Sequence, residues 1–169
     1  MNSLPKRKPT RIKDYDYNSS GAYFLTICTQ NRRSVLSNIV GTGVLDGPSV
    51  QFAPHGEIAD KIINQLNDFY EDISVDRYVI MPNHIHLLLL VRQGGPSRTP
   101  VPTRQNSVVS RFVATFKRFC NKEYGENIWQ SRFNDHVIRN REDYEAHLRY
   151  IHENPTRWYY DELYTDDSP

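Results

Sequence analysis

VIMPNHIHLLLLV, residues 79–91, is the stretch of sequence that decides the fold. Aliphatic side chains lie on both sides of Pro82-Asn83, a dipeptide that breaks an extended chain sharply. The pattern predicts one strand over 75–81 and a second strand over 84–91. We therefore expect the two strands to form a hairpin or a sharply bent ribbon.

The second of these strands contains a His-Ile-His motif. Side chains two apart on a strand point the same way, so His84 and His86 share one face while Ile85 and Leu87 face the core. Two convergent imidazoles are a start on a site for a divalent metal, although a hydrogen-bonded pair of half-buried histidines is the commoner explanation of an isolated His-X-His motif. A histidine-triad hydrolase needs a third histidine where this chain has Leu88. A two-histidine phosphodiesterase needs a second His-X-Thr/Ser motif, which is absent around the other histidines: His55, His136, His147 and His152.

The segments around this motif predict an alternation of strands and helices. Strands are expected at 22–29 and 133–139, a hairpin at 35–52, and helices at 57–70, from a Ser107 cap onward, and at 142–154 before Pro155. Apolar stripes mark the first two helices: Ile58, Ile62, Leu66 and Phe69, then Val109, Phe112, Val113, Phe116, Phe119 and Cys120. The order predicts an α+β, ferredoxin-like sandwich, with helices on one face of a mainly antiparallel sheet and a ligand site on the other.

Length and composition indicate one domain. The boundaries we expect are a basic flexible arm at 1–20, a domain at 21–158 and an acidic tail at 159–169, with a flexible loop at 93–106. No apolar run reaches bilayer length, the N-terminus lacks the apolar segment of a secretory signal, and two cysteines make no disulfide framework. These features predict a cytoplasmic protein without a membrane partner.

Charge is strongly segregated behind a net charge of only +1. The arm is basic, with Lys6, Arg7, Lys8 and Arg11. Residues 77–122 contain eight basic side chains and no acid, among them Arg111, Lys117 and Arg118, whereas 46–76 carry seven acids against Lys61. The basic stretch predicts contacts with nucleic-acid phosphates, and a solvated basic face is the alternative.

The last helix contains a tyrosine that packing does not require. Tyr144, Leu148 and Ile151 fall on one apolar stripe, and Tyr150 lies away from it. At helical spacing Tyr150 aligns with Asn154, whose amide can bind a metal. A surface tyrosine near a helix end is the alternative, since the chain has eleven tyrosines.

Together these motifs resemble the single-tyrosine HUH transposases, in particular the branch of REP-associated tyrosine transposases. The resemblance runs from about residue 22 to 155 and rests on FLTICTQNRR (24–33), VIMPNHIHLLLLV (79–91), FVATFKRF (112–119), IWQSRFNDHVIR (128–139) and YIHENP (150–155). Many relatives have an aromatic residue where this chain has Asn134. His136 and Asp135 lie in a recurring segment, where a core or hydrogen-bonding role is expected.

The resemblance implies an enzyme that cleaves and rejoins DNA. His84, His86 and Asn154 would bind Mg²⁺ or Mn²⁺, and Tyr150 would attack a phosphodiester to leave a 5′-phosphotyrosine and a free 3′-hydroxyl. The implied substrate is single-stranded DNA with a hairpin, bound through the arm and the basic stretch by a monomer or homodimer on the nucleoid.

Three other functions remain open from the sequence. One is a related HUH endonuclease of plasmid replication or mobilisation, which shares the chemistry and differs in substrate. Another is a non-catalytic nucleic-acid-binding module on a ferredoxin-like sheet. The third is a metal-dependent nuclease that uses water and never bonds to DNA.

Overall fold

The computed structural model describes residues 19–41, 47–92 and 107–165. Their main sheet has four antiparallel strands in the order β4-β5-β1-β6, and a separate two-stranded sheet pairs β2 with β3. The strands are β1 (Gly21–Cys28), β2 (Ser37–Val40), β3 (Ser49–Phe52), β4 (Ile73–Ile80), β5 (His84–Val91) and β6 (Asn134–Val137). The helices are α1 (Pro54–Phe69), α2 (Val108–Tyr124) and α3 (Arg141–Glu153), with 3-10 turns η1 (Gln30–Arg32) and η3 (Trp158–Tyr160).

The predicted strand pair around Pro82-Asn83 is confirmed as a tight β4–β5 hairpin. The amide of Met81 donates to the carbonyl of His84 at 2.9 Å, which closes the turn. β5 pairs along its whole length with β1, so that Cys28 lies opposite His84 and Thr26 opposite His86.

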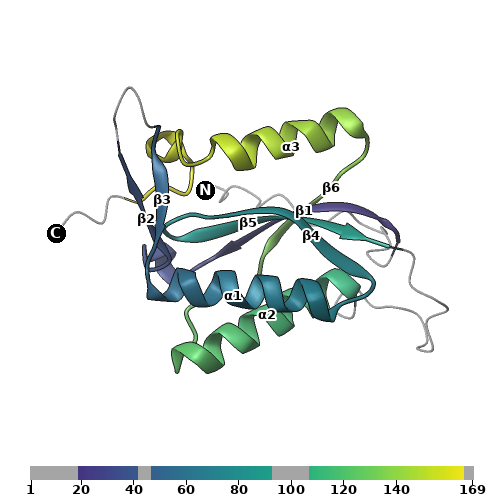
Figure 1. The fold of residues 1–169 in the computed structure, drawn as a ribbon, viewed down its shortest axis with the longest axis horizontal. Coiled ribbons are helices and arrows are strands. Elements are labelled where there is room, and N and C mark those ends of the chain that lie inside the picture. Colours follow the sequence, from purple (N-terminus) through teal and green to yellow (C-terminus); the bar gives the residue numbers. More distant parts are fainter. Residues whose placement is uncertain (1–18, 42–46, 93–106, 166–169) are drawn as a thin grey trace, which may run out of the picture.

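The predicted α+β sandwich is also confirmed (Figure 1). Helices α1 and α2 cover one face of the main sheet, where side chains such as Ile85, Leu87 and Phe112 form the larger core. The expectation that the helices share one face is wrong for the third helix, α3, which lies over the opposite face, the one that carries the histidines. There Ile151 packs with Phe24 and Leu88 in a smaller core. The histidine face is therefore partly covered by the helix that bears Tyr150.

Two side chains of the predicted apolar stripes are not in the core. Phe69 is 75% exposed because it is the last residue of α1, where the chain turns away at Tyr70. Phe119 is 37% exposed, and the Arg118 guanidinium lies over its ring. Cys120, one residue later, is fully buried and fills the core position instead.

Helix ends follow local chemistry. The Ser107 hydroxyl accepts the amide hydrogen of Ser110, as the predicted cap requires. α1 begins three residues before the expected start, at Pro54, because proline at the first helical position forfeits no hydrogen bond.

The expected arm lies outside the described residues except for 19 and 20, and so does the loop at 93–106. Among the described residues, no helix combines the length and apolarity that crossing a bilayer requires.

Close packing at the start of α1 gives a first prediction. A Cβ added to Gly56 would overlap the carbonyl oxygen of Leu36, which accepts a hydrogen bond from Ala53. Gly56→Ala should therefore lower the free energy of unfolding by about 1–3 kcal/mol despite alanine's higher helix propensity. Urea denaturation measures the change. Gly47→Ala is the control, since nothing lies within 4 Å of an added Cβ there, and equal stability of the two variants would contradict the prediction.

Candidate active site

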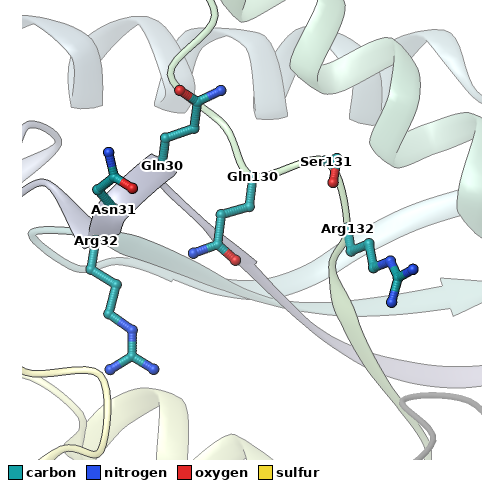
Figure 2. A pocket seen from close by; sticks show the side chains of 6 residues that line it. All are labelled: Gln30, Asn31, Arg32, Gln130, Ser131 and Arg132. Carbon is teal, nitrogen blue, oxygen red and sulfur yellow. The ribbon is translucent and has the colours of Figure 1, made fainter.

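A polar pocket of about 760 Å³ lies where two connections meet, η1 after β1 and the segment before β6. It is lined by Gln30, Asn31, Arg32, Gln130, Ser131 and Arg132 (Figure 2). Arg32 extends from this pocket toward the C-terminal segment, where its Nη1 donates to the carbonyl of Glu162 at 3.0 Å. The pocket thus borders the histidine site.

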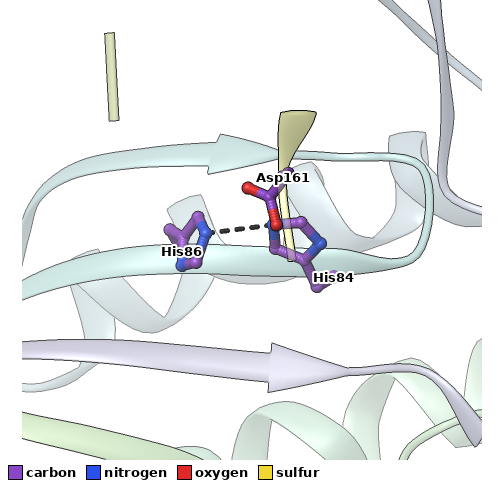
Figure 3. A group of neighbouring side chains, drawn as sticks. All are labelled: His84, His86 and Asp161. Carbon is purple, nitrogen blue, oxygen red and sulfur yellow. Dashed lines mark hydrogen bonds between the residues drawn. The ribbon is translucent and has the colours of Figure 1, made fainter. Parts of the chain in front are cut away.

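The two histidines of β5 point at each other from the face that α3 covers. Their Nε2 atoms are 3.0 Å apart, and both side chains are buried (Figure 3). The expectation that His84 and His86 share one face is confirmed.

Hydrogen bonds hold each imidazole from behind. Nδ1 of His84 lies 2.8 Å from Oδ1 of Asn83, whose Nδ2 donates to the Leu163 carbonyl. Since that amide oxygen can only accept, His84 donates through Nδ1 and directs the lone pair of Nε2 into the site. Nδ1 of His86 lies 2.9 Å from the hydroxyl of Thr26 on the neighbouring strand.

Burial keeps both imidazoles neutral. It lowers the pKa of His84 from 6.5 to about 3, with a further contribution from the positive charge of Arg32. It also lowers the pKa of His86 well below the usual value, assisted by the neighbouring His84. Neutral imidazoles can act as metal ligands without first losing a proton.

Helix α3 brings the predicted tyrosine, Tyr150, and the predicted amide residue, Asn154, next to the histidines. The Tyr150 hydroxyl donates to Oδ2 of Asp161 at 3.2 Å, and Nδ2 of Asn154 donates to the same oxygen at 3.0 Å. The Tyr150 ring lies 5.1 Å from the His86 ring, centroid to centroid. All four residues that the sequence singled out are therefore neighbours.

Asp161 is a site residue that the sequence analysis missed, because it was assigned to an acidic tail. Its carboxylate lies close to both histidines, and one ligand atom from each of Asp161, His84 and His86 falls within 4.8 Å of the others. The signal in the sequence that could have included this segment in the domain is Trp158, because a tryptophan beyond the last helix predicts packing. Its side chain is buried, and its ring centroid lies 5.9 Å from that of His84.

The donor set fits a divalent cation. Oδ1 of Asn154 is buried and has no hydrogen-bond partner among the described residues, an arrangement that is costly unless something else satisfies the oxygen. The other polar atom of this side chain, Nδ2, contacts Asp161, which forms a group of possible ligands with the two neutral imidazoles. The nitrogen and oxygen donors of His84, His86 and Asp161 could bind a metal, with the Asn154 amide beside them.

The Tyr150 phenol is held in its protonated form. Burial is the largest cause that raises its pKa to about 12, followed by the negative charge of Asp161 and the hydrogen bond to that carboxylate. The residue nevertheless lies at the protein surface, since Tyr150 is 40% exposed.

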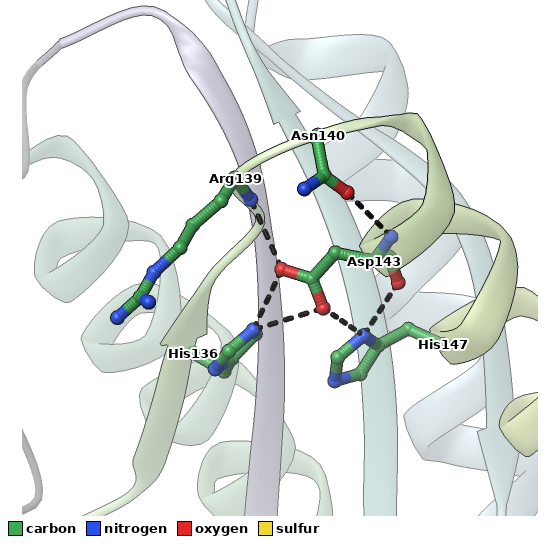
Figure 4. A network of polar contacts seen from close by, with 5 residues as sticks. All are labelled: His136, Arg139, Asn140, Asp143 and His147. Atoms are coloured by element: carbon green, nitrogen blue, oxygen red, sulfur yellow. Dashed lines mark hydrogen bonds and ion pairs between the residues drawn. The ribbon is translucent and has the colours of Figure 1, made fainter.

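A second group of possible ligands lies at the start of α3, formed by His136, Asp143 and His147 (Figure 4). The Asp143 carboxylate accepts from the Arg139 amide at 3.0 Å and lies 2.9 Å from Nε2 of His136. The rings of His136 and His147 stack at 4.7 Å. The expected hydrogen-bonding role of His136 is confirmed by these contacts.

The predicted DNA-binding side chains do not gather at the histidines. Lys6, Arg7, Lys8 and Arg11 lie outside the described residues. Arg111 and Arg118 are exposed on α2, which covers the opposite face of the sheet. Lys117 donates to the carbonyls of Gln130 at 2.7 Å and Arg132 at 3.2 Å, so its ammonium supports the pocket wall. Contact of these residues with DNA stays a prediction.

Comparison with known proteins confirms the resemblance inferred from the motifs. No protein-family model matches the chain. A Haemophilus influenzae protein described only as uncharacterized is 29% identical over 175 residues, 95% of this chain and 94% of that protein. The REP-associated tyrosine transposase of Escherichia coli K12 is 28% identical over 141 residues, 83% of this chain and 70% of that protein. A putative REP-associated tyrosine transposase of Haemophilus influenzae is 27% identical over 159 residues, 89% of this chain and 79% of that protein.

A solved structure of a REP-associated tyrosine transposase bound to a REP hairpin has the same fold. Its TM-score is 0.58 at 23% sequence identity, and the match covers 91% of this chain and 74% of that one.

The buried imidazoles predict a specific dependence of stability on pH. The pKa of His84 is 6.5 in the unfolded chain and about 3 in the folded chain, so between these values the unfolded chain binds more protons. The free energy of unfolding should therefore be greatest above pH 6.5 and fall as the pH is lowered toward 3. In urea denaturation with EDTA present, His84→Gln should show a shallower fall than the unsubstituted protein. Parallel curves would contradict the assignment.

Proposed function

Since its relatives indicate a tyrosine transposase of the REP-associated type, we propose that this chain cleaves and rejoins single-stranded DNA through Tyr150, assisted by Mg²⁺ or Mn²⁺. The observation that supports this most directly is the shared carboxylate of Asp161. It accepts hydrogen bonds from Tyr150 and Asn154 beside the two buried histidines. The proposed nucleophile, Tyr150, therefore lies directly beside the candidate cation site.

The proposed step is an exchange of one phosphodiester for another. The Tyr150 oxygen forms a bond to phosphorus, the bond from phosphorus to the 3′ oxygen breaks, and that oxygen leaves as a 3′-hydroxyl after taking a proton. The product is a 5′-phosphotyrosine, which a 3′-hydroxyl can attack to restore a DNA phosphodiester and free Tyr150. No nucleotide cofactor is needed, because the covalent link conserves the bond energy.

Asp161 can accept the proton of the Tyr150 phenol. A phenol with a pKa of about 12 is a weak nucleophile at neutral pH. The hydrogen bond to Oδ2 of Asp161 gives the proton a path away from the attacking oxygen and fixes the orientation of the hydroxyl.

The cation would be held by Nε2 of His84, Nε2 of His86, Oδ1 of Asn154 and the Asp161 carboxylate. When bound, it supplies charge to polarise the scissile phosphate and orient it toward the nucleophile. Neutral imidazoles with amide and carboxylate oxygens suit Mn²⁺ and also accept Mg²⁺.

The substrate is proposed to be a single strand that carries a hairpin, by analogy with the solved relative that is bound to a REP hairpin. A hydroxyl on a helix surface reaches an unstacked strand more readily than a duplex interior. Tyr159 and Tyr160 are 59% and 90% exposed just before Asp161, where they offer rings on which bases can stack.

A monomer suffices for the proposed chemistry. Tyr150 reaches the histidines of its own chain, so no helix from a second copy is required to complete the site. The segment after residue 158 also contributes, through Asp161 and Leu163. We therefore propose that the functional unit extends past the expected boundary at 158.

Metal binding is the first test. In calorimetric titration with Mn²⁺, His84→Ala should abolish measurable binding, because it removes a donor from the centre of the group. Thr26→Val should weaken binding roughly 10- to 100-fold, because it removes the hydrogen bond that orients His86. His152→Ala is the control, an exposed histidine on the same helix as Tyr150. Unchanged binding in His84→Ala would indicate that the metal binds elsewhere. The group of His136, Asp143 and His147 would then be the next site to test.

Covalent chemistry is the second test. With Mn²⁺ and a labelled hairpin-bearing single strand, the protein should form an adduct that survives SDS. Tyr150→Phe should form none, because the substituted ring has no hydroxyl oxygen to bond to phosphorus. His84→Ala should reduce the rate at least about 100-fold.

Tyr159→Phe is the matched control, since it removes a nearby exposed hydroxyl and should leave the adduct unchanged. Cleavage without any adduct would indicate a nuclease that uses water. DNA binding with neither cleavage nor adduct would indicate a non-catalytic module. An adduct in Tyr150→Phe would assign the nucleophile to another residue.

A further inference from the structure

The pocket beside the histidines has the composition of a binding site for a nucleotide. Two guanidinium groups, three carboxamides and one hydroxyl line it, and none of the described residues contributes a carboxylate. Guanidinium groups bind phosphate through paired hydrogen bonds, and carboxamides can both donate to and accept from base edges. A polar concave surface of this size, without an acid, disfavours a cation or an apolar ligand.

The walls of the pocket are fixed to each other before any ligand arrives. The backbone amide of Gln30 donates to the Ile128 carbonyl at 2.7 Å, and the backbone amide of Gln130 donates to the Cys28 carbonyl at 2.9 Å. Nζ of Lys117 donates hydrogen bonds to the backbone carbonyls of Gln130 and Arg132. A pre-organised pocket loses little conformational entropy on binding.

The two guanidinium groups of the pocket are not neutralised by a carboxylate among the described residues, although Nη1 of Arg32 donates to the Glu162 carbonyl. Among the described residues, neither Arg32 nor Arg132 forms an ion pair, whereas the adjacent Arg33 pairs with Glu126 at 3.8 Å. Asn31 and Arg32 both have φ of +54°, in the left-handed region that costs a residue with a Cβ some free energy. From this backbone conformation the Arg32 side chain extends to the Glu162 carbonyl, next to Asp161.

Hydrogen bonds between Thr29 and Asn83 connect the pocket to the histidine site. Thr29, which precedes the pocket wall, donates through both its amide and its hydroxyl to the carbonyl of Asn83. Asn83 in turn holds His84. A strand whose scissile phosphate lay at the histidines would therefore have its adjacent nucleotide within reach of the pocket.

We infer that this pocket binds the nucleotide next to the scissile phosphate, with its phosphate between Arg32 and Arg132 and its base edge on the carboxamides. This inference rests on the proposed function for the position of the scissile phosphate. It assigns to the pocket the alignment of the single strand, which the histidines and Tyr150 do not supply.

The test is the salt dependence of binding, measured by fluorescence anisotropy with a labelled pool of random-sequence single strands and EDTA present to prevent cleavage. Each phosphate contact on a single strand contributes about 0.7 to the slope of log affinity against log salt concentration. Arg132→Gln should therefore reduce the slope by about 0.7. Arg132→Lys, which keeps the charge, should restore most of it. Arg132 is exposed, and its backbone carbonyl still binds Lys117 in both variants.

Two charge-matched controls bracket the result. Lys61→Gln removes an exposed cation from α1 on the far face and should leave the slope unchanged. Arg33→Gln removes a cation beside the pocket but outside its lining, and should change the slope by much less than Arg132→Gln. An unchanged slope in Arg132→Gln would overturn the inference, and so would an equal loss in Arg33→Gln, because it would indicate diffuse attraction.

The two proposals fail separately. A reduced slope in Arg132→Gln, with no SDS-resistant adduct from the unsubstituted protein, would retain the pocket as a DNA contact and remove the tyrosine chemistry. An adduct lost in Tyr150→Phe, with an unchanged slope in Arg132→Gln, would retain the chemistry and remove the pocket.

Discussion

The pairing of β5 with β1 is the constraint on which the rest of this structure depends. An antiparallel register that places Thr26 opposite His86 gives that imidazole its hydrogen bond and directs both histidines to one face. Because side chains alternate along a strand, a slip of one residue would send the histidines into the larger core and bring Ile85 to the site. Just beyond the two strands, the backbone amide and the hydroxyl of Thr29 donate to the Asn83 carbonyl and continue this pairing, and Asn83 also orients His84.

Burying two imidazoles next to each other has a consequence for both stability and chemistry. Removal from water disfavours their charged forms, so the fold is most stable with both rings neutral. A pair of neutral rings with Nε2 atoms 3.0 Å apart can share at most one proton between them. The site is thus electron-rich, and the unsatisfied oxygen of Asn154 adds to this character. The same burial that costs stability in acid creates a place suited to a cation.

Asp161 connects α3 to the segment that follows it. Its carboxylate accepts from Tyr150 and Asn154 on α3, and its backbone follows a 3-10 turn whose Trp158 packs beside His84. The Arg32 bond to Glu162 extends this connection to the pocket. Contacts within a single copy of the chain therefore bring together the proposed nucleophile, the candidate cation ligands and the pocket.

The sequence by itself determined the α+β class, the shared face of His84 and His86, and the exposed position of Tyr150 on the last helix. These follow from periodicity and from turn residues, which act over a few neighbours in the chain. Only the tertiary structure decided that α3 covers the histidine face, that Asp161 belongs to the site, and that segments about a hundred residues apart form one pocket. Such contacts depend on how complete elements pack, and no local pattern of residues specifies that.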